Sequence, residues 1–337
     1  MNNRIYYPSG FLNIGGILSY NCTFNFIVGG RGTGKTYGAL KTVVDNDLTF
    51  MLMRRTQKQT DMINKPEFSP FKKLATDEHL DISTKSVSKD NARFEMNGRT
   101  IGYTCALSTI SSMRGFDASD VKILVYDEFV PEKHERPFKE EGLAFLNCYE
   151  TLNRNRELFG EKPLTVLCLA NAFNIANPVF LELGLVGIAE KMILEGRELY
   201  INRDKSILLC LPDSAKIKDE KSNTALYKLT EGSSFNKMAL ENDFVFNPRD
   251  FIKSAPLKEY RPMVTIGEIT IYKHKSQRRY YVSEHRTGNP PTFTTDDVGL
   301  KKYRKNYGLR LYKAYMQNLC QFENILTKSL FECYNII

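Results

Sequence analysis

Residues 24–36 of this chain are FNFIVGGRGTGKT, an apolar run followed directly by a glycine-rich loop that ends in Lys35 and Thr36. The loop fits the pattern G-x-x-x-x-G-K-[ST] in full. Glycines in such a loop let backbone N–H groups converge on phosphate oxygens, and the following helix directs its positive end to the same place. The apolar residues 23–28 predict a strand, and residues 35–44 predict a helix. The stretch therefore predicts a phosphate-binding P-loop rather than a chance glycine-rich turn.

The pattern also assigns individual roles in binding ATP and Mg²⁺. Lys35 is expected to bridge the β- and γ-phosphates and to act in catalysis, and Thr36 is expected to bind Mg²⁺. The expected nucleotide-binding residues are Gly29, Gly30, Arg31, Gly32, Thr33, Gly34, Lys35 and Thr36.

A second apolar run, ILVYDE at residues 123–128, has the form of a Walker B strand. Asp127 at its end is expected to hold the Mg²⁺ shell, and Glu128 to polarise the water that attacks the γ-phosphate. Strands often end in acidic surface residues, so the run alone is weak evidence. Because it follows a complete P-loop pattern in the right order, it favours an enzyme that hydrolyses ATP.

Five further residues, at three places in the sequence, are candidates with a plain structural alternative. Asn171 ends the apolar run 164–170, where it could sense the γ-phosphate or simply form a turn or cap. Arg154 and Arg156 lie at the end of a predicted helix, where an arginine could stabilise transition-state charge in a neighbouring subunit or close the helix. The pair Arg54–Arg55, after the strand predicted over 49–53, could contact phosphates or DNA or form a solvated strand end.

The pattern of runs predicts a fold and its division into parts. Apolar runs alternating with helical stretches through the first half predict an α/β fold with a mostly parallel sheet. The expected divisions are an ATPase domain over 1–200, a polar lid or linker region over 201–244, and a smaller α+β domain over 245–337. The expected elements of the first half are a hairpin over 93–104 with Asn97-Gly98 as a type I′ turn, strands over 121–126 and 164–169, and a helix over 139–159. In the C-terminal part we expect strands over 263–272 and 279–283 and a long final helix from about Val298, capped near residues 295–297.

The composition of the chain indicates the cellular environment and the kinds of partner to expect. The chain has 337 residues, 42% of them hydrophobic and 26% charged, and lacks a run of about eighteen apolar residues, so we expect no membrane partner. Its seven cysteines form no CxxC pair and its N-terminus has no apolar signal region, which favours a reducing cytosol. The formal net charge is +8, and residues 271–315, with eleven Lys or Arg against three Asp or Glu, carry an equal excess. This segment is either a binding surface for a polyanion such as nucleic acid or a solvated basic face.

The C-terminal part offers no recognisable second active site. A metal nuclease needs several converging carboxylates, and those of this region have no recognisable spacing: Glu268, Glu284, Asp296, Asp297 and Glu323. The four histidines, His79, His134, His274 and His285, likewise lack metal-ligand spacing.

Several of these stretches together resemble the DNA-encapsidation ATPases of small podophages. They are residues 24–36, VYDEF at 125–129, NRNRE at 153–157, CLANA at 168–172 with Asn177-Pro178, and the segments 232–244 and 300–314. The resemblance runs over most of the chain in the family's order. The Arg-Asn-Arg-Glu and Asn-Ala-x-x-x-x-Asn-Pro contexts make it far more specific than Walker motifs alone.

The resemblance implies an ASCE-type P-loop NTPase that assembles as a ring, taken to have five subunits, on the portal of an empty procapsid in the host cytoplasm. It implies ATP-driven translocation of double-stranded DNA, with Arg154 the better candidate for a trans-acting finger and Arg156 the second. It also implies an RNase H-like C-terminal domain that binds nucleic acid without cutting it. Some members use a structural RNA between motor and portal.

Two alternatives remain open at this level. One is a terminase-like ATPase whose C-terminal domain also cleaves DNA, against which the scattered carboxylates argue. The other is a nucleic-acid-binding NTPase switch with negligible turnover, against which the Asp127–Glu128 pair argues, since a switch gains nothing from a positioned water.

Overall fold

In the computed structural model of this chain, the described residues are 4–88, 90–113, 117–131, 135, 138, 140–171, 175–213, 215–233, 236 and 252–335. The chain forms two compact units, Met1–Val245 and Phe246–Ile337, and each is described by itself. Lys139, His134 and most of the segment 232–244, for which we had expectations, lie outside the described residues.

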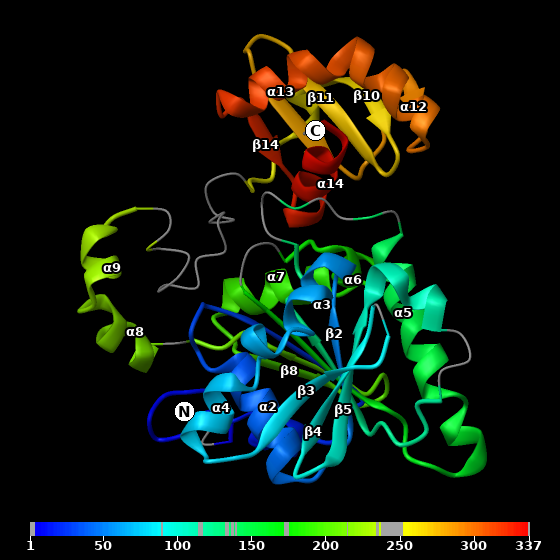
Figure 1. Cartoon of the computed structure of the whole chain (residues 1–337). Helices are drawn as coiled ribbons and strands as arrows, with labels where there is room; N and C mark the ends of the chain where they lie inside the picture. Colours follow the sequence, from blue (N-terminus) through cyan, green and yellow to red (C-terminus); the bar gives the residue numbers. More distant parts are fainter. Residues whose placement is uncertain are drawn as a thin grey trace. The chain divides into compact units, whose positions relative to one another are not determined.

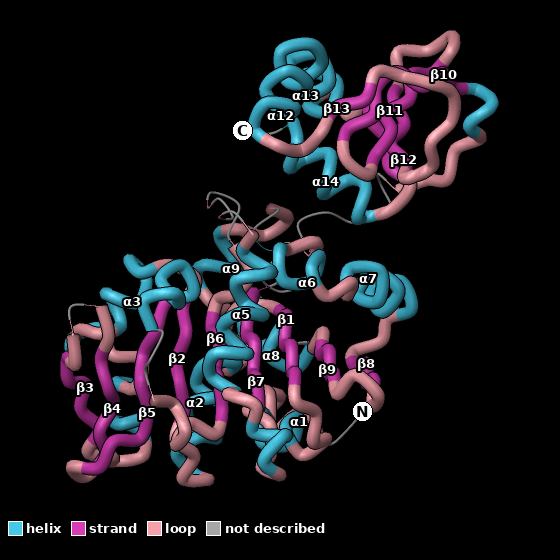
Figure 2. Tube along the Cα trace, turned by 90° about the vertical axis from the view of Figure 1, so that its right-hand side faces the viewer, coloured by secondary structure: helices cyan, strands magenta, loops and turns pink. Residues whose placement is uncertain are grey.

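The N-terminal unit is built on a nine-stranded sheet in the order β3-β4-β5-β2-β6-β7-β1-β9-β8 (Figure 2). Its strands are β1 Phe24–Gly29, β2 Phe50–Arg54, β3 Ile82–Ser86, β4 Ala92–Met96, β5 Arg99–Ala106, β6 Ile123–Asp127, β7 Thr165–Asn171, β8 Leu199–Asn202 and β9 Ile207–Cys210. The six from β5 to β9 in this order pair in parallel, and β3, β4 and β8 join antiparallel at the two edges.

The order of the central strands determines the class of P-loop fold. Strand β7 lies between β1, which leads into the glycine loop, and β6, which carries the acidic pair. A strand inserted at this place is the arrangement of the ASCE type, so this expectation is confirmed. The carboxyl ends of β1, β7, β6 and β2 lie side by side at one edge, where ligands bind in open parallel sheets.

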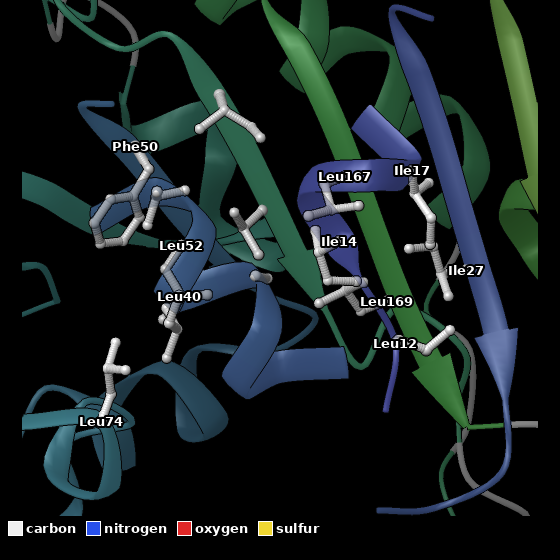
Figure 3. Packing of buried hydrophobic residues seen from close by; sticks show 14 of the residues in the cluster. Leu12, Ile14, Ile17, Ile27, Leu40, Phe50, Leu52, Leu74, Leu167 and Leu169 are labelled. Carbon is white, nitrogen blue, oxygen red and sulfur yellow. The ribbon is translucent and has the colours of Figure 1, made fainter. Parts of the chain in front are cut away.

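Both faces of the sheet are covered at its centre, which is why the central strands β1, β2, β6 and β7 are mostly apolar and buried. On one face, alternate strand residues such as Ile27 and Leu167 pack against Ile14 and Leu40 of the helices α1 Ile14–Leu18 and α2 Lys35–Asp45 (Figure 3). On the other face, the ring of Phe26 contacts phenylalanines of the helices α5 Glu141–Asn153 and α6 Pro178–Glu182. The other α-helices among the described residues of this unit are α3 Gln57–Ile63, α4 Lys72–Asp77, α7 Val186–Glu195, α8 Ala215–Ser222 and α9 Ala225–Leu229.

The expected hairpin is present, whereas the expected linker begins too early. Asn97 and Gly98 both have positive φ, 52° and 78°, between the paired ends of β4 and β5. The expectation of a lid or linker over 201–244 is wrong for its first part, because Ile207–Cys210 form a fully buried strand beside β1. This strand is only four residues long and lies between polar stretches, so its apolar run gave a weak signal. The helix expected over 139–159 is the shorter α5, which ends where Arg154 takes a left-handed conformation, φ 47°.

The C-terminal unit has a five-stranded sheet in the order β13-β10-β11-β12-β14, with helices packed on it (Figure 1). Its strands are β10 Tyr260–Ile266, β11 Ile269–His274, β12 Tyr280–Ser283, β13 Thr292–Phe293 and β14 Cys320–Phe322. An antiparallel meander β10-β11-β12 with a strand parallel to its first member is the arrangement expected of an RNase H-like sheet. Strand β14 extends it beside β12.

The long helix expected from Val298 is interrupted. It consists of α12 Asp297–Tyr303, a π-helical turn Arg304–Gly308 and α13 Leu309–Met316, after which β14 precedes α14 Ile325–Asn335. The expected cap is present, since the side chain of Asp296 accepts a hydrogen bond from the backbone N–H of Gly299 at 2.7 Å. Among the described residues of both units, no helix is long and apolar enough to cross a membrane.

Candidate nucleotide-binding and catalytic site

The loop between β1 and α2 has the geometry of a phosphate cradle. Gly32 and Gly34 adopt positive φ, 70° and 87°, which residues with a side chain rarely adopt. Gly29 is required for a different reason, since a Cβ there would lie 2.6 Å from the ring of Pro212. The loop ends at the first turn of the eleven-residue α2, so free N–H groups of a helix start face the loop.

Lys35 is folded back onto this loop. Its ammonium donates to the carbonyl oxygens of Gly29 at 3.0 Å and Gly30 at 2.7 Å. Burial lowers the pKa of Lys35 to about 7, and the carboxylate of Asp127 opposes this change. A buried ammonium that binds only neutral oxygens stands ready to pair with an anion placed in the loop.

Thr36 and Asp127 meet, although 91 residues separate them in the chain. The Thr36 hydroxyl lies 3.1 Å and 3.0 Å from the two carboxylate oxygens of Asp127. A hydroxyl beside a carboxylate offers the hard oxygen ligands that Mg²⁺ prefers. The residues present thus fit both ATP and Mg²⁺, with Thr36 and Asp127 as the residues that would hold the metal.

Glu128 stands just past the end of β6 in a left-handed conformation, φ 58°. Such a conformation costs of the order of 1 kcal/mol or more for a residue with a side chain and is found most often at functional sites. The N–H of the next residue, Phe129, donates to the carbonyl of Leu169 on β7 at 3.2 Å and anchors the turn. The carboxylate of Glu128 remains half exposed, so it is accessible to water.

Arg54 connects both acidic residues, a role that the sequence did not reveal. Its guanidinium lies 3.0 Å from the carboxylate of Asp127 and 2.6 Å from that of Glu128, and its side chain is 12% exposed. Its Nε is buried and has no hydrogen-bond partner. Arg54 ends β2, which lies beside β6. The available sequence signal was a predicted strand followed by a charged residue. One sequence does not show which strands are neighbours in the sheet, so the contact with the acidic strand could not be predicted.

The neighbouring Arg55 has a structural role instead. Its side chain is 1% exposed and makes two hydrogen bonds to Glu141 at the start of α5, at 2.6 and 2.9 Å, and one to Glu135 at 2.8 Å. This buried ion pair ties the end of β2 to the start of α5. Neither arginine is therefore a solvated strand end.

Asn171 lies at the same edge of the sheet. It is the last residue of β7, directly beside Gly29 of β1, and its side chain is half-buried. The structure thus places Asn171 between the glycine loop and the acidic strand, where a side chain can contact either.

Arg154 and Arg156 lie away from this edge. Arg156 is buried, and its guanidinium donates to the carbonyls of Val121 at 2.7 Å and Ala118 at 2.8 Å, just before β6 begins. Arg154 is largely exposed and lies 3.5 Å from Asp117. Since α5 has thirteen residues and an α-helix rises about 1.5 Å per residue, it carries Arg154 roughly 20 Å from its own start beside Arg55.

In the C-terminal unit, the candidate carboxylates do not converge. Glu284 and Glu323 are near each other, because the Glu284 N–H donates to Glu323 at 3.0 Å, and His285 lies 3.3 Å from the same carboxylate. Asp296 instead caps α12. Within the described residues, no group of three or more Asp, Glu, His or Cys is placed to hold a metal ion.

The basic segment of this unit is divided between surface charges and buried aromatic rings. Tyr280, Tyr281 and Tyr303 are at most 3% exposed and belong to the core. The exposed basic residues are Lys273, Lys275, Arg278, Arg279, Arg286, Lys301, Lys302, Lys305, Arg310 and Lys313. The surface of the segment therefore presents mainly charge, with Tyr312 as an exposed aromatic residue.

The strand order, the glycine loop and the acidic pair together define a P-loop NTPase of the ASCE type. The family model described as Podovirus DNA encapsidation protein (Gp16) matches residues 5–335. The chain belongs to this family.

Individual relatives agree with this assignment. The DNA packaging protein of Bacillus phage phi29 is 28% identical over 338 residues, covering 95% of each chain. Among solved structures, the bacteriophage Phi-29 viral genome packaging motor assembly matches with a TM-score of 0.65 and 24% identity, covering 95% of this chain and 97% of that one. The Phi-28 gp11 DNA packaging motor matches with a TM-score of 0.60 and 19% identity, covering 99% and 98%. At these identities the two structures support the fold.

Proposed function

We propose that this chain is the ATP-hydrolysing subunit of a motor that translocates double-stranded DNA into a viral procapsid. The observation that carries the proposal is the contact of Thr36 in the glycine loop with Asp127, the residue that directly precedes Glu128. Membership of a DNA encapsidation family supplies the process that such an ATPase would drive.

The residues would divide the work as follows. The loop and Lys35 bind the triphosphate, and Thr36 and Asp127 hold Mg²⁺, which neutralises charge on the phosphates when bound. Glu128 orients and deprotonates the attacking water. In the structure, however, its carboxylate is paired with Arg54 at 2.6 Å. Arg54 therefore holds Glu128 in a resting position, and this contact must loosen before hydrolysis.

Arg154 is proposed to act on the site of a neighbouring subunit. Its exposed position at the far end of α5 from the nucleotide edge of its own unit supports a role in another subunit's site. Arg156 is committed to two backbone carbonyls and would position the turn that presents Arg154. A ring of subunits, which we take to be a pentamer, supplies the required neighbour.

The partners of the ring are part of the same proposal. The motor would work on the portal of the procapsid in the host cytoplasm, and a structural RNA is a further candidate partner. The exposed lysines and arginines of the C-terminal unit suit contact with phosphate backbones, which they bind without reading sequence. Cleavage of DNA by this unit is disfavoured, because no described carboxylate cluster could hold catalytic metal ions.

The test is ATP hydrolysis by the purified protein with and without double-stranded DNA, at several salt concentrations. We expect DNA to stimulate hydrolysis, and the stimulation to fade as salt rises, because phosphate contacts release counterions. A rate of ATP hydrolysis that DNA does not change at any salt concentration would contradict the proposed translocase. Nicking of the DNA in the presence of Mg²⁺ would favour the terminase-like alternative.

A further inference from the structure

A lysine from outside the Walker motifs reaches the glycine loop. Lys221 lies near the end of α8, which follows β9 in the chain. Its ammonium donates a hydrogen bond to the carbonyl of Arg31 in the loop. It is so close that a Cβ on Gly32 would lie 2.5 Å from its Nζ. Gly32 thus faces the flexible end of the Lys221 side chain, while its own positive φ is what favours a glycine there.

The surroundings of this ammonium contain an excess of positive charge. Lys35, Arg31 and Lys221 converge on the loop, where the carboxylate of Asp127 also acts on Lys35. Burial also lowers the pKa of Lys221 itself. These three cations outnumber the carboxylate of Asp127, so the loop keeps a positive charge that favours a further anion. A polyphosphate is the anion for which this loop is built.

Lys221 also contacts a residue of the neighbouring helix α9. The Lys221 ammonium lies 5.9 Å from the ring centroid of Tyr227 on α9, within the range of a cation–π contact. Arg31 and Gly32 lie in the part of the loop whose backbone faces the phosphates in P-loop proteins. An ammonium at this point needs only a small change of its flexible four-carbon chain to exchange a carbonyl partner for a phosphate oxygen.

From these contacts we propose that Lys221 is a second phosphate-binding lysine of the nucleotide site, supplied by α8, and that it couples nucleotide occupancy to the position of the α8–α9 segment. The inference rests on the proposed nucleotide binding and adds to it a residue outside the Walker motifs. Its consequence is that the segment Ala215–Leu229, which precedes the C-terminal unit in the chain, responds to the nucleotide through one side chain.

The experiment compares the full-length protein with the variants Lys221→Met, Lys221→Arg and Lys35→Ala. Lys228→Met is the matched control, because Lys228 is exposed on the adjacent α9. Affinity is measured for ATP with Mg²⁺ and for inorganic tripolyphosphate. The thermal midpoint of each variant is measured without and with ATP, and hydrogen exchange is followed over residues 215–229.

We expect Lys221→Met to weaken the binding of ATP and of tripolyphosphate by the same factor, about tenfold or more, as expected for loss of a hydrogen bond to a charged group. The midpoint of the nucleotide-free protein should stay unchanged, while its rise on adding ATP becomes smaller. ATP should slow exchange over 215–229 in the wild type and in Lys228→Met but not in Lys221→Met. Lys221→Arg should recover most of the affinity.

Two results would overturn the inference. One is wild-type affinity of Lys221→Met for both ligands. The other is a lowered midpoint without nucleotide and unchanged affinity, which would mean that Lys221 only stabilises the loop. If the wild type binds ATP and Lys35→Ala does not, either result contradicts only the role of Lys221 and leaves the proposed nucleotide site intact. If the wild type itself binds no ATP, the proposed function fails.

Discussion

Arg54, the last residue of β2, and Glu128, the first residue beyond β6, are joined by an ion pair of 2.6 Å. The same guanidinium lies 3.0 Å from Asp127. The side chain proposed to activate water is therefore restrained by a residue that belongs to neither Walker motif. Because the strands of both residues are neighbours in the sheet, a small shift between β2 and β6 could make or break this contact.

Replacing Glu128 with Gln should abolish hydrolysis and spare binding. The amide keeps the shape of the side chain but cannot take a proton from water, so we expect turnover to fall about 10²-fold or more. ATP affinity should change little, because Lys35 and the loop remain intact. Single-turnover hydrolysis and equilibrium binding measure the two effects, with Glu161→Gln, an exposed residue, as the control. Undiminished hydrolysis would remove Glu128 from its assigned role.

Replacing Arg54 with Ala should release Glu128. We expect hydrolysis without DNA to rise and stimulation by DNA to shrink, because the resting restraint on the carboxylate is gone. The ratio of ATPase rates with and without DNA measures this effect. A loss of hydrolysis with intact ATP binding would instead give Arg54 a positive role in the chemistry, and an unchanged ratio would show that the ion pair does not control Glu128.

Replacing Arg154 with Ala should impair hydrolysis only where subunits act on one another. Loss of a trans-acting arginine costs about 10³-fold or more in rate where such fingers operate, while ATP binding and stability should persist because Arg154 is exposed. Arg99→Ala, at another exposed arginine, is the matched control. Mixing Arg154→Ala with Lys35→Ala subunits should restore part of the activity, since an intact loop then meets an intact finger. Failure of this complementation, with both variants assembled, would argue against action in trans.

Replacing Arg156 with Ala should act on stability. The change removes a buried guanidinium that donates two hydrogen bonds, so the carbonyls of Val121 and Ala118 lose this donor. We expect a loss of about 2–4 kcal/mol in the free energy of unfolding, measured by denaturant titration. Binding of ATP per folded molecule should be retained. A variant of unchanged stability that has lost hydrolysis would reverse the roles proposed for Arg154 and Arg156.

Much of the nucleotide site was predictable because its chemistry is local. The loop from Gly29 to Thr36 is one continuous stretch, and the requirement for positive φ at Gly32 and Gly34 is a property of the backbone at those positions. The strand ending in Asp127 was visible as an apolar run with an acidic end. The polar turn Asn97-Gly98 specified its own hairpin for the same reason.

Other features could not be predicted because the residues that stabilise them are far apart in the sequence. Strand β9 is too short to stand out and is stabilised by its pairing with β1 and its complete burial. The final helix contains a π-helical turn and is followed by the short β14, whose place is set by pairing with β12. Local propensity cannot specify pairings of this kind, because their stabilisation comes from residues far away in the chain.

By itself, the sequence determined the phosphate loop, the acidic strand, the α/β class and the surplus of positive charge near the C-terminus. Each of these is encoded in consecutive residues or in composition. Only the tertiary structure decided that Arg54 holds Glu128, that Arg55 and Arg156 are buried in structural contacts, that Arg154 lies far from its own nucleotide edge, and that Lys221 reaches the loop. The physical reason is that a charged side chain has the same letter in the sequence whether it is solvated, paired or catalytic. Its role is set by the charges and carbonyls that the fold places within about 3 Å of it.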